Sequence, residues 1–225
     1  MSGLVLPAVE IEPEGPARAT VLFLHGLGAD GHDFEPVVPY FGLPEGHGIR
    51  FVFPHAPSRP VTVNGGMVMP AWFDIKGMDL AQAPDAHGIE SSSRLVRTLL
   101  EREAARGVPP ERTVLAGFSQ GGAMALQVGL TYPKALAGIL GLSCYLPLPD
   151  RLHGEEAEAN RATPIFLAHG TEDDVVVLPR GEAARDLLAS ASYAVDWRTY
   201  AMGHQVDAQE IVDIGQWLAE RLLES

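Results

Sequence analysis

Short runs of branched apolar residues recur along the chain. They cover residues 20–24, 50–53, 113–116, 137–142, 164–168 and 195–200. Apolar runs of this length, without alternation, are typical of strands that are buried on both faces. Between several of them, apolar residues repeat at spacings of three and four, which predicts helices. These helices cover residues 89–105, 120–131, 179–191 and 208–223. Alternating strands and helices predict an α/β fold: a mostly parallel central sheet, right-handed crossovers and helices on both faces.

The composition agrees with a compact chain of this kind. With 225 residues, 46% of them hydrophobic, the chain can bury one substantial core. Its 24 glycines and 18 prolines are scattered between the apolar runs, so they mark turns and form no linker. We therefore expect a single domain over residues 1–225.

The charge narrows the possible partners. The net charge is -13, with 16 basic against 29 acidic side chains, so a basic face that neutralises nucleic-acid phosphates is not expected. We attribute this charge to solubility rather than to the steering of cationic substrates. No apolar run approaches the roughly 20 residues of a membrane span, and the first residues lack the basic and apolar regions of a signal peptide. The single cysteine, Cys144, cannot form an internal disulfide. These features predict a cytoplasmic protein without stable membrane insertion.

A candidate nucleophile follows the third apolar run. Gly117, Ser119 and Gly121 form the pattern GxSxG, in which small neighbours allow a sharp strand-to-helix turn that exposes the serine hydroxyl. The pattern alone is weak, because a glycine-rich turn with a capping serine has the same letters. Here a predicted strand precedes it and an amphipathic helix follows it, which is the setting that the turn requires.

A serine hydroxyl needs a base, and the usual base is a histidine oriented by a carboxylate. In folds with this turn the chain order is serine, acid, histidine. Of the histidines after Ser119, His153 has no strand directly before it, and His169 would leave only a mid-chain insert to supply the acid. His204, in a strand-to-helix loop beside Gly203, remains as the predicted base.

The acid is less clearly indicated by the pattern. Glu172, Asp173 and Asp174 share one loop after a predicted strand, and Asp150 is a remote rival in the preceding crossover. Periodicity does not choose among the three neighbours.

Two backbone N–H groups are predicted to bind the oxygen anion that forms when a carbonyl is attacked. One belongs to Gln120, directly after the nucleophile, and the other is assigned to Leu27 in the glycine-flanked loop after the first strand.

Residues 57–74 are apolar but broken by Pro and by Asn-Gly-Gly, which predicts a long loop or hairpin that covers the site. Met67, Val68, Met69 and Trp72 would then line an acyl pocket, although core packing is the alternative for each of the first three. Cys144 lacks an elbow motif and fits a buried small residue better than a nucleophile.

Several long segments together resemble one known family. These are VLFLHGLGADGHDF, FVFPHAPSRPVTVNGGMVMPAWFD, VLAGFSQGGAMAL, GLSCYLPL, HGTEDDVV and the later GH. They resemble the carboxylesterase and acyl-protein thioesterase family of α/β hydrolases over nearly the whole chain, and the loop before Trp72 resembles the bacterial carboxylesterase branch most closely. The resemblance implies that Asp173 is the acid, that Leu27 and Gln120 are the oxyanion donors, and that homodimers are frequent.

The sequence thus predicts a serine carboxylesterase that hydrolyses short to medium acyl esters through an acyl-serine intermediate, with no metal or organic cofactor. Many thioesterase members have Pro where this chain has Asp174, which favours the esterase hypothesis. An acyl-protein thioesterase or lysophospholipase acting on long acyl chains is the alternative. A non-catalytic ligand-binding homologue is the third hypothesis, and the intact Ser119, Asp173 and His204 argue against it.

Overall fold

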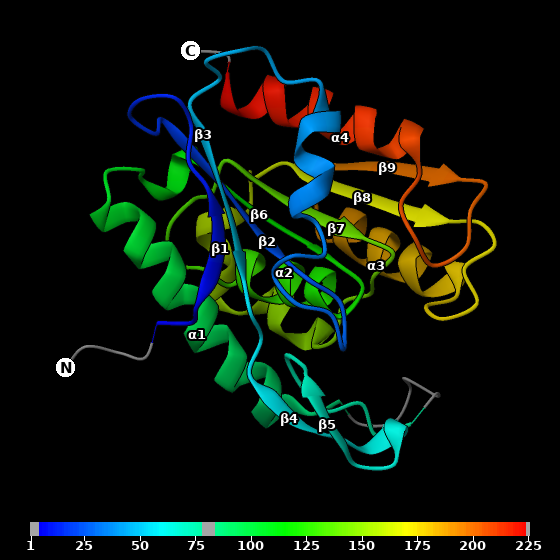
Figure 1. Ribbon diagram of the computed structural model, residues 1–225. Coiled ribbons are helices and arrows are strands. Elements are labelled where there is room, and N and C mark those ends of the chain that lie inside the picture. Colours follow the sequence, from blue (N-terminus) through cyan, green and yellow to red (C-terminus); the bar gives the residue numbers. More distant parts are fainter. Residues whose placement is uncertain (1–4, 78–83, 224–225) are drawn as a thin grey trace.

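The computed structural model describes residues 5–77 and 84–223, so the start of the chain, where no signal peptide is expected, lies partly outside the described residues. One seven-stranded sheet has the order β1-β3-β2-β6-β7-β8-β9. The edge strand β1 (Ala8–Ile11) is antiparallel to its neighbour, and every other pair is parallel. The parallel strands are β2 (Ala19–Leu24), β3 (Ile49–Pro54), β6 (Thr113–Phe118), β7 (Gly138–Leu142), β8 (Ile165–Gly170) and β9 (Val195–Tyr200). The predicted mostly parallel sheet is confirmed (Figure 1).

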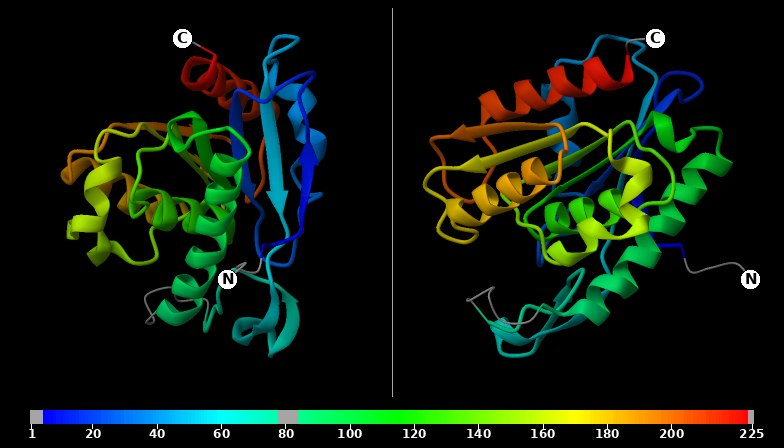
Figure 2. Two further views of the ribbon diagram at one scale, coloured as in Figure 1. Left: turned by 90° about the vertical axis from the view of Figure 1, so that its left-hand side faces the viewer. Right: turned by 180° about the vertical axis from the view of Figure 1, so that it is seen from behind.

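Helices cover both faces of the sheet (Figures 1 and 2). They are α1 (Ala86–Ala105), α2 (Gln120–Leu130), α3 (Leu178–Ser190) and α4 (Ala208–Leu222), with the short 3-10 segments η1 (Glu35–Phe41), η2 (Thr62–Asn64), η3 (Pro110–Arg112), η4 (Pro149–His153) and η5 (Glu155–Asn160). Successive side chains of a strand point to opposite faces. In β2, Leu22 and Leu24 pack toward α1, α2 and α3, which we call the α1 face. Val21 and Phe23 pack toward η1 and α4, which we call the α4 face.

The edge strand β1 was not predicted, because four half-buried residues give too short a pattern. Charged pairs between β1 and α1 hold it in place. Glu10 accepts from Arg102 at 2.9 Å and from Arg106 at 2.7 Å. Both arginines also contact Glu103, a fully buried carboxylate on α1. The strand is therefore fixed by pairs that are far apart in the sequence.

The strand order creates a crevice at the carboxyl ends of β2 and β6. From β2 the chain moves outward to β3, and it then returns past β2 to form β6 on the other side. The first crossover lies on the α4 face and the second on the α1 face, so the loops after β2 and β6 diverge from each other. Such a switch point is where open parallel sheets bind ligands.

A two-stranded hairpin of β4 (Ser58–Val61) and β5 (Met67–Pro70) follows β3 and projects from the side of the sheet where the parallel strand β3 ends (Figure 1). Gly65 and Gly66 turn its tip with φ of 67° and 79°, values that favour glycine. The expectation of a hairpin instead of a core strand in this segment is confirmed.

None of the helices within residues 5–77 and 84–223 is long and apolar enough to cross a membrane.

Candidate active site

The turn between β6 and α2 holds Ser119 in a strained conformation, with φ 54° and ψ -119°. The glycines on either side make this turn possible. A Cβ on Gly117 would lie 2.3 Å from the carbonyl oxygen of Gly121, and a Cβ on Gly121 would lie 2.1 Å from that of Leu24. The Ser119 N–H donates to the carbonyl of Leu142 at 2.8 Å, which ties the turn to β7. The surrounding structure therefore maintains this strained turn, and the turn places the hydroxyl at the carboxyl end of β6.

His204 lies beside this serine. Its Nε2 is 2.8 Å from Ser119 Oγ, and its Nδ1 is 2.7 Å from Asp173 Oδ2. The ring of Phe118 supports the imidazole, with the ring centroids 4.8 Å apart. A carboxylate oxygen only accepts, so Nδ1 carries the proton and the lone pair of Nε2 points at the serine hydroxyl.

Asp173 is oriented by its own loop. Its Oδ1 accepts from the backbone N–H groups of Val175 and Val176, both at 2.9 Å, which leaves Oδ2 for His204. Asp173 is buried, whereas the neighbouring Glu172 and Asp174 are exposed. Burial and hydrogen bonding therefore distinguish the three carboxylates that the sequence pattern left open. The remote rival Asp150 lies exposed in η4.

His169 is buried behind this loop. Its Nε2 donates to the carbonyl of Val176 at 2.6 Å and lies 3.5 Å from Asp173 Oδ2. An imidazole whose Nε2 is occupied in this way supports the acid loop and offers no base to Ser119. The side chain of His153 lies outside the described part of the chain.

The two predicted oxyanion donors lie on either side of Ser119. Gln120 is the first residue of α2, so its N–H has no acceptor within the helix and lies at the positive end of the helix dipole. In the loop after β2, the N–H of Gly28 donates to Pro70 at 2.9 Å and that of Ala29 to Gly26 at 3.3 Å. Among the described residues, the N–H of Leu27, directly before Gly28, has no hydrogen-bond acceptor. Both free N–H groups belong to residues that line the same cleft.

His25, to which the sequence analysis gave no role of its own, fixes this loop. The Ala56 N–H donates to His25 Nε2 at 3.0 Å, so the ring proton is on Nδ1, which donates to the carbonyl of Gly26 at 2.7 Å. That carbonyl belongs to the same peptide group as the N–H of Leu27. Burial lowers the pKa of His25, which keeps the imidazole neutral. The feature of the sequence that could have suggested this role is the position of a histidine directly before the glycine-flanked loop.

Trp72 and Met69 do not line the cleft, which corrects the expectation from the sequence. The Trp72 ring is fully buried, and its Nε1 donates to the carbonyl of His25 at 2.9 Å. The tryptophan therefore supports residues 25–28, which we call the oxyanion loop after the role predicted for Leu27. Met69 Sδ accepts from Asn64 within the hairpin, and Met67 and Val68 are exposed. None of these three side chains is among the residues that line the cleft.

The side chain of Gln120 is a second feature that the pattern did not reveal. Its Oε1 accepts from the Trp72 N–H at 2.8 Å, and its Nε2 donates to the carbonyl of Phe73 at 2.8 Å. All three residues are buried. One glutamine thus joins the nucleophile turn to the chain that leaves the hairpin.

These groups surround a cleft of about 380 Å³. The lining residues are Gly26, Leu27, Ala29, Asp33, Val63, Asn64, Ile75, Gly77, Phe118, Ser119, Gln120, Tyr145, Val175, Val176 and His204. The hairpin contributes through its tip and its return segment. The cleft is mostly apolar, and Ser119 and His204 are among its lining residues.

Cys144 offers no alternative nucleophile. Its side chain is 3% exposed, and burial raises the pKa of its thiol to about 12. The thiolate, which is the reactive form, is therefore scarce at neutral pH. This confirms the expectation of a buried small residue.

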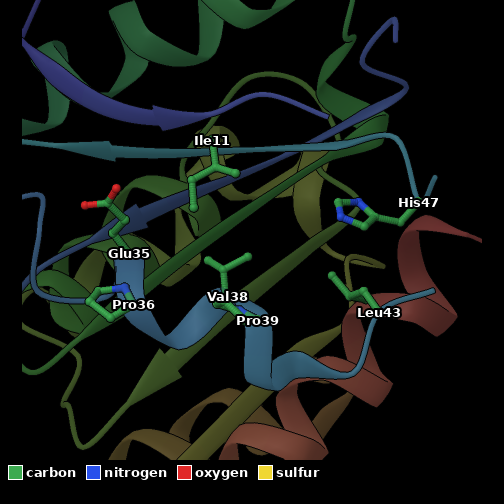
Figure 3. A pocket seen from close by; sticks show the side chains of 7 residues that line it. All are labelled: Ile11, Glu35, Pro36, Val38, Pro39, Leu43 and His47. Atoms are coloured by element: carbon green, nitrogen blue, oxygen red, sulfur yellow. The ribbon is translucent and has the colours of Figure 1, made fainter. Parts of the chain in front are cut away.

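A second hollow, of about 520 Å³, lies between η1 and the edge of the sheet at β1 (Figure 3). Ile11, Val38 and Leu43 make much of it apolar. Its titratable groups are engaged locally: Glu35 binds His32 at 2.7 Å, and His47 Nδ1 accepts from the Ile49 N–H at 2.9 Å. No nucleophile is among the described residues that line it, so the candidate chemistry belongs to the cleft at Ser119.

The sequence and the fold of this chain are similar to those of known hydrolases. The sequence model of the phospholipase/carboxylesterase family matches residues 7–222. Acyl-protein thioesterase 1 of Gibberella zeae is 40% identical over 98% of this chain and 97% of its own length. A protein of Oryza sativa subsp. japonica named probable carboxylesterase is 34% identical over 99% of this chain and 85% of its own. The crystal structure of Arabidopsis thaliana SOBER1 superimposes with a TM-score of 0.83 at 35% identity, covering 92% of this chain and all of that chain.

These relatives are fungal and plant proteins, so the expectation of a closest resemblance to the bacterial carboxylesterase branch is not supported. The broader resemblance is confirmed over nearly the full length. Thioesterases and carboxylesterases both occur among the relatives. The chain belongs to the phospholipase/carboxylesterase family of α/β hydrolases.

Proposed function

We propose that this protein is a serine carboxylesterase that hydrolyses short to medium acyl esters through an acyl-Ser119 intermediate. The observation that carries the proposal is the hydrogen-bonded series Ser119, His204 and Asp173, of which the first two line an apolar cleft. The chemistry follows from which atom holds each proton.

In the first step, His204 Nε2 removes the hydroxyl proton as Ser119 Oγ attacks the carbonyl carbon. Asp173 stabilises the imidazolium that forms. The carbonyl oxygen becomes an anion, and the N–H groups of Leu27 and Gln120 bind it there. Each such donor is worth about 3 kcal/mol of transition-state stabilisation. His204 then gives the proton to the leaving alcohol.

The second step repeats this chemistry with water. His204 removes a proton from water, the hydroxide attacks the acyl-Ser119 carbonyl, and Ser119 leaves with the proton returned to it. The same oxyanion donors serve both steps because the reacting carbonyl does not move. Apart from water, these two reaction steps need no group beyond the side chains and N–H groups already named.

A thioesterase acting on long acyl chains is the second candidate. It is favoured by relatives named acyl-protein thioesterase 1, such as that of Neurospora crassa, which is 42% identical over 97% of this chain. The acyl-enzyme chemistry is the same for an oxyester and a thioester, so the two candidates differ only in the leaving group and the acyl length.

Matched oxyesters and thioesters with acyl chains of two to sixteen carbons separate the two candidates. We expect kcat/KM to be highest for short to medium oxyesters and to fall for longer chains. A consistent preference for long acyl thioesters would replace the first candidate by the second. Ser119→Ala measured on the same series shows how much turnover depends on the proposed nucleophile.

A further inference from the structure

Asp33 is the one carboxylate among the described residues that line the cleft. It lies in the turn after the oxyanion loop, where its N–H donates to the carbonyl of Asp30 at 3.2 Å. Its carboxylate forms no hydrogen bond or ion pair with any described residue. No lysine or arginine is among the described residues that line the cleft. The cleft that contains Ser119 and His204 is therefore also lined by an exposed carboxylate, without a lysine or arginine among its described lining residues to offset the charge.

The two ends of the cleft differ in character. Ile75 and Tyr145 pack against the core of the α1 face, and with Val63 they form an apolar end. Phe118 packs against the core of the α4 face and contacts the ring of Phe34, with centroids 5.6 Å apart. Since Phe34 follows Asp33 directly, Asp33 lies at the α4-face end.

His204 assigns the two parts of a substrate to these ends. The leaving group must lie within reach of His204 Nε2, which returns the proton to it. His204 packs on Phe118, which belongs to the α4-face end. The acyl chain then occupies the apolar end, and the leaving group extends toward Asp33.

We propose, on the basis of the function proposed above, that Asp33 selects acyl donors whose leaving group carries a positive charge. A carboxylate in the same cleft as the proposed oxyanion donors disfavours the anionic transition state unless a cation accompanies it. The Asp33 side chain is exposed in its turn, and partial desolvation, with the nearby charge of Asp30 as a further cause, raises its pKa although the charge of His25 opposes this. An ammonium group on the alcohol or thiol supplies such a cation. The shared chemistry is a cationic leaving group, carried by a small amino alcohol or by a basic peptide around an acylated cysteine.

Three esters of one acyl group isolate this charge. They are the 2-(trimethylammonio)ethyl ester, its uncharged carbon isostere the 3,3-dimethylbutyl ester, and the anionic 2-sulfoethyl ester. We expect the ratio of kcat/KM for the cationic over the neutral ester to fall about fivefold in Asp33→Asn, the size of one partly exposed ion pair. The ratio should also shrink in high salt.

Asp30→Asn is the matched control, because Asp30 is an exposed acid in the same turn that does not line the cleft. It should leave the ratio as in the wild type. S-acyl cysteine peptides flanked by lysine, serine or glutamate test the second source, and a lysine preference that disappears in Asp33→Asn points to a basic peptide. An unchanged ratio in Asp33→Asn, with all three esters turned over, would overturn this inference alone. Absence of turnover on every ester would refute the proposed function instead.

Discussion

His25 Nδ1 lies 2.7 Å from the carbonyl oxygen of Gly26, the peptide group whose N–H belongs to Leu27. Carbonyl and N–H point in opposite directions in a trans peptide, so this hydrogen bond fixes the direction of the proposed oxyanion donor. It also polarises the peptide, which strengthens the N–H as a donor. On the proposed function, we therefore expect this buried histidine to affect the transition state without contacting the substrate.

Replacing His25 should slow the reaction without weakening substrate binding. We expect His25→Ala to lower kcat by about tenfold to a hundredfold, less than the loss of a whole oxyanion donor, with KM changed by less than about twofold. Affinity for a trifluoromethyl ketone, which forms a tetrahedral adduct, should fall in parallel with kcat. His25→Asn, whose amide N–H can occupy the position of Nδ1, should recover part of the loss. A rise in KM with kcat unchanged would show that His25 acts on binding instead.

Trp72 should affect rate and not acyl selectivity. Because its indole donates to the His25 carbonyl and does not line the cleft, Trp72→Phe removes a support of the oxyanion loop. We expect lower kcat at every acyl length and an unchanged length preference, measured on the same ester series. Met69→Ala serves as the comparison from the hairpin. A shifted length optimum in Trp72→Phe would restore the pocket role that the sequence first suggested.

The Gln120 side chain should matter for stability. Gln120→Ala leaves the buried N–H of Trp72 and the carbonyl of Phe73 without partners. We expect the free energy of unfolding to fall by about 2 to 4 kcal/mol, measured by urea denaturation. Gln216→Ala, at an exposed position of α4, is the control and should change stability by less than about 0.5 kcal/mol. Equal losses in the two variants would contradict the bridging role.

Glu210 on α4 gives a pH-dependent prediction. Both of its carboxyl oxygens are buried, and neither has a hydrogen-bond partner among the described residues. Burial, with the neighbouring charge of Asp207 as a second cause, raises the pKa of Glu210 from 4.5 to about 8. Between these values the folded protein holds a proton that the unfolded chain has released. The free energy of unfolding therefore falls as pH rises through this window.

Glu210→Gln should remove this slope, because an amide does not titrate. At a pH about one unit above the folded pKa we expect the variant to exceed the wild type in stability by on the order of 2 kcal/mol. Urea denaturation at acidic, neutral and alkaline pH measures the slope. Glu220→Gln, at an exposed position of the same helix, should behave like the wild type. Identical slopes in the wild type and Glu210→Gln would refute the prediction.

The sequence predicted the parts of this molecule that depend on local pattern. Continuous apolar runs and helical periodicity located the parallel strands and the four long helices to within a few residues. The positions of Ser119 and His204 followed from turn chemistry and chain order. Asp173 required the family resemblance, because its burial and its contact with His204, 31 positions away, are tertiary facts.

The supporting contacts could not be predicted for the same reason. The bonds of Gln120 to Trp72 and Phe73 join residues 47 or 48 positions apart. Trp72 was assigned to the pocket because an aromatic residue in a covering loop suits a ligand site. Only the packed structure shows that its ring lies behind the oxyanion loop, where the indole N–H has a carbonyl to bind.

The most direct test of the central claim is the covalent state of Ser119 during turnover. Wild-type protein rapidly quenched after mixing with a nitrophenyl ester should gain the mass of one acyl group, located by peptide mass spectrometry on the segment that contains Ser119. Ser119→Ala should remain folded, gain no acyl group and lose at least about a thousandfold in kcat. Near wild-type hydrolysis by Ser119→Ala, or an acyl group on another residue in the wild type, would contradict the proposed function.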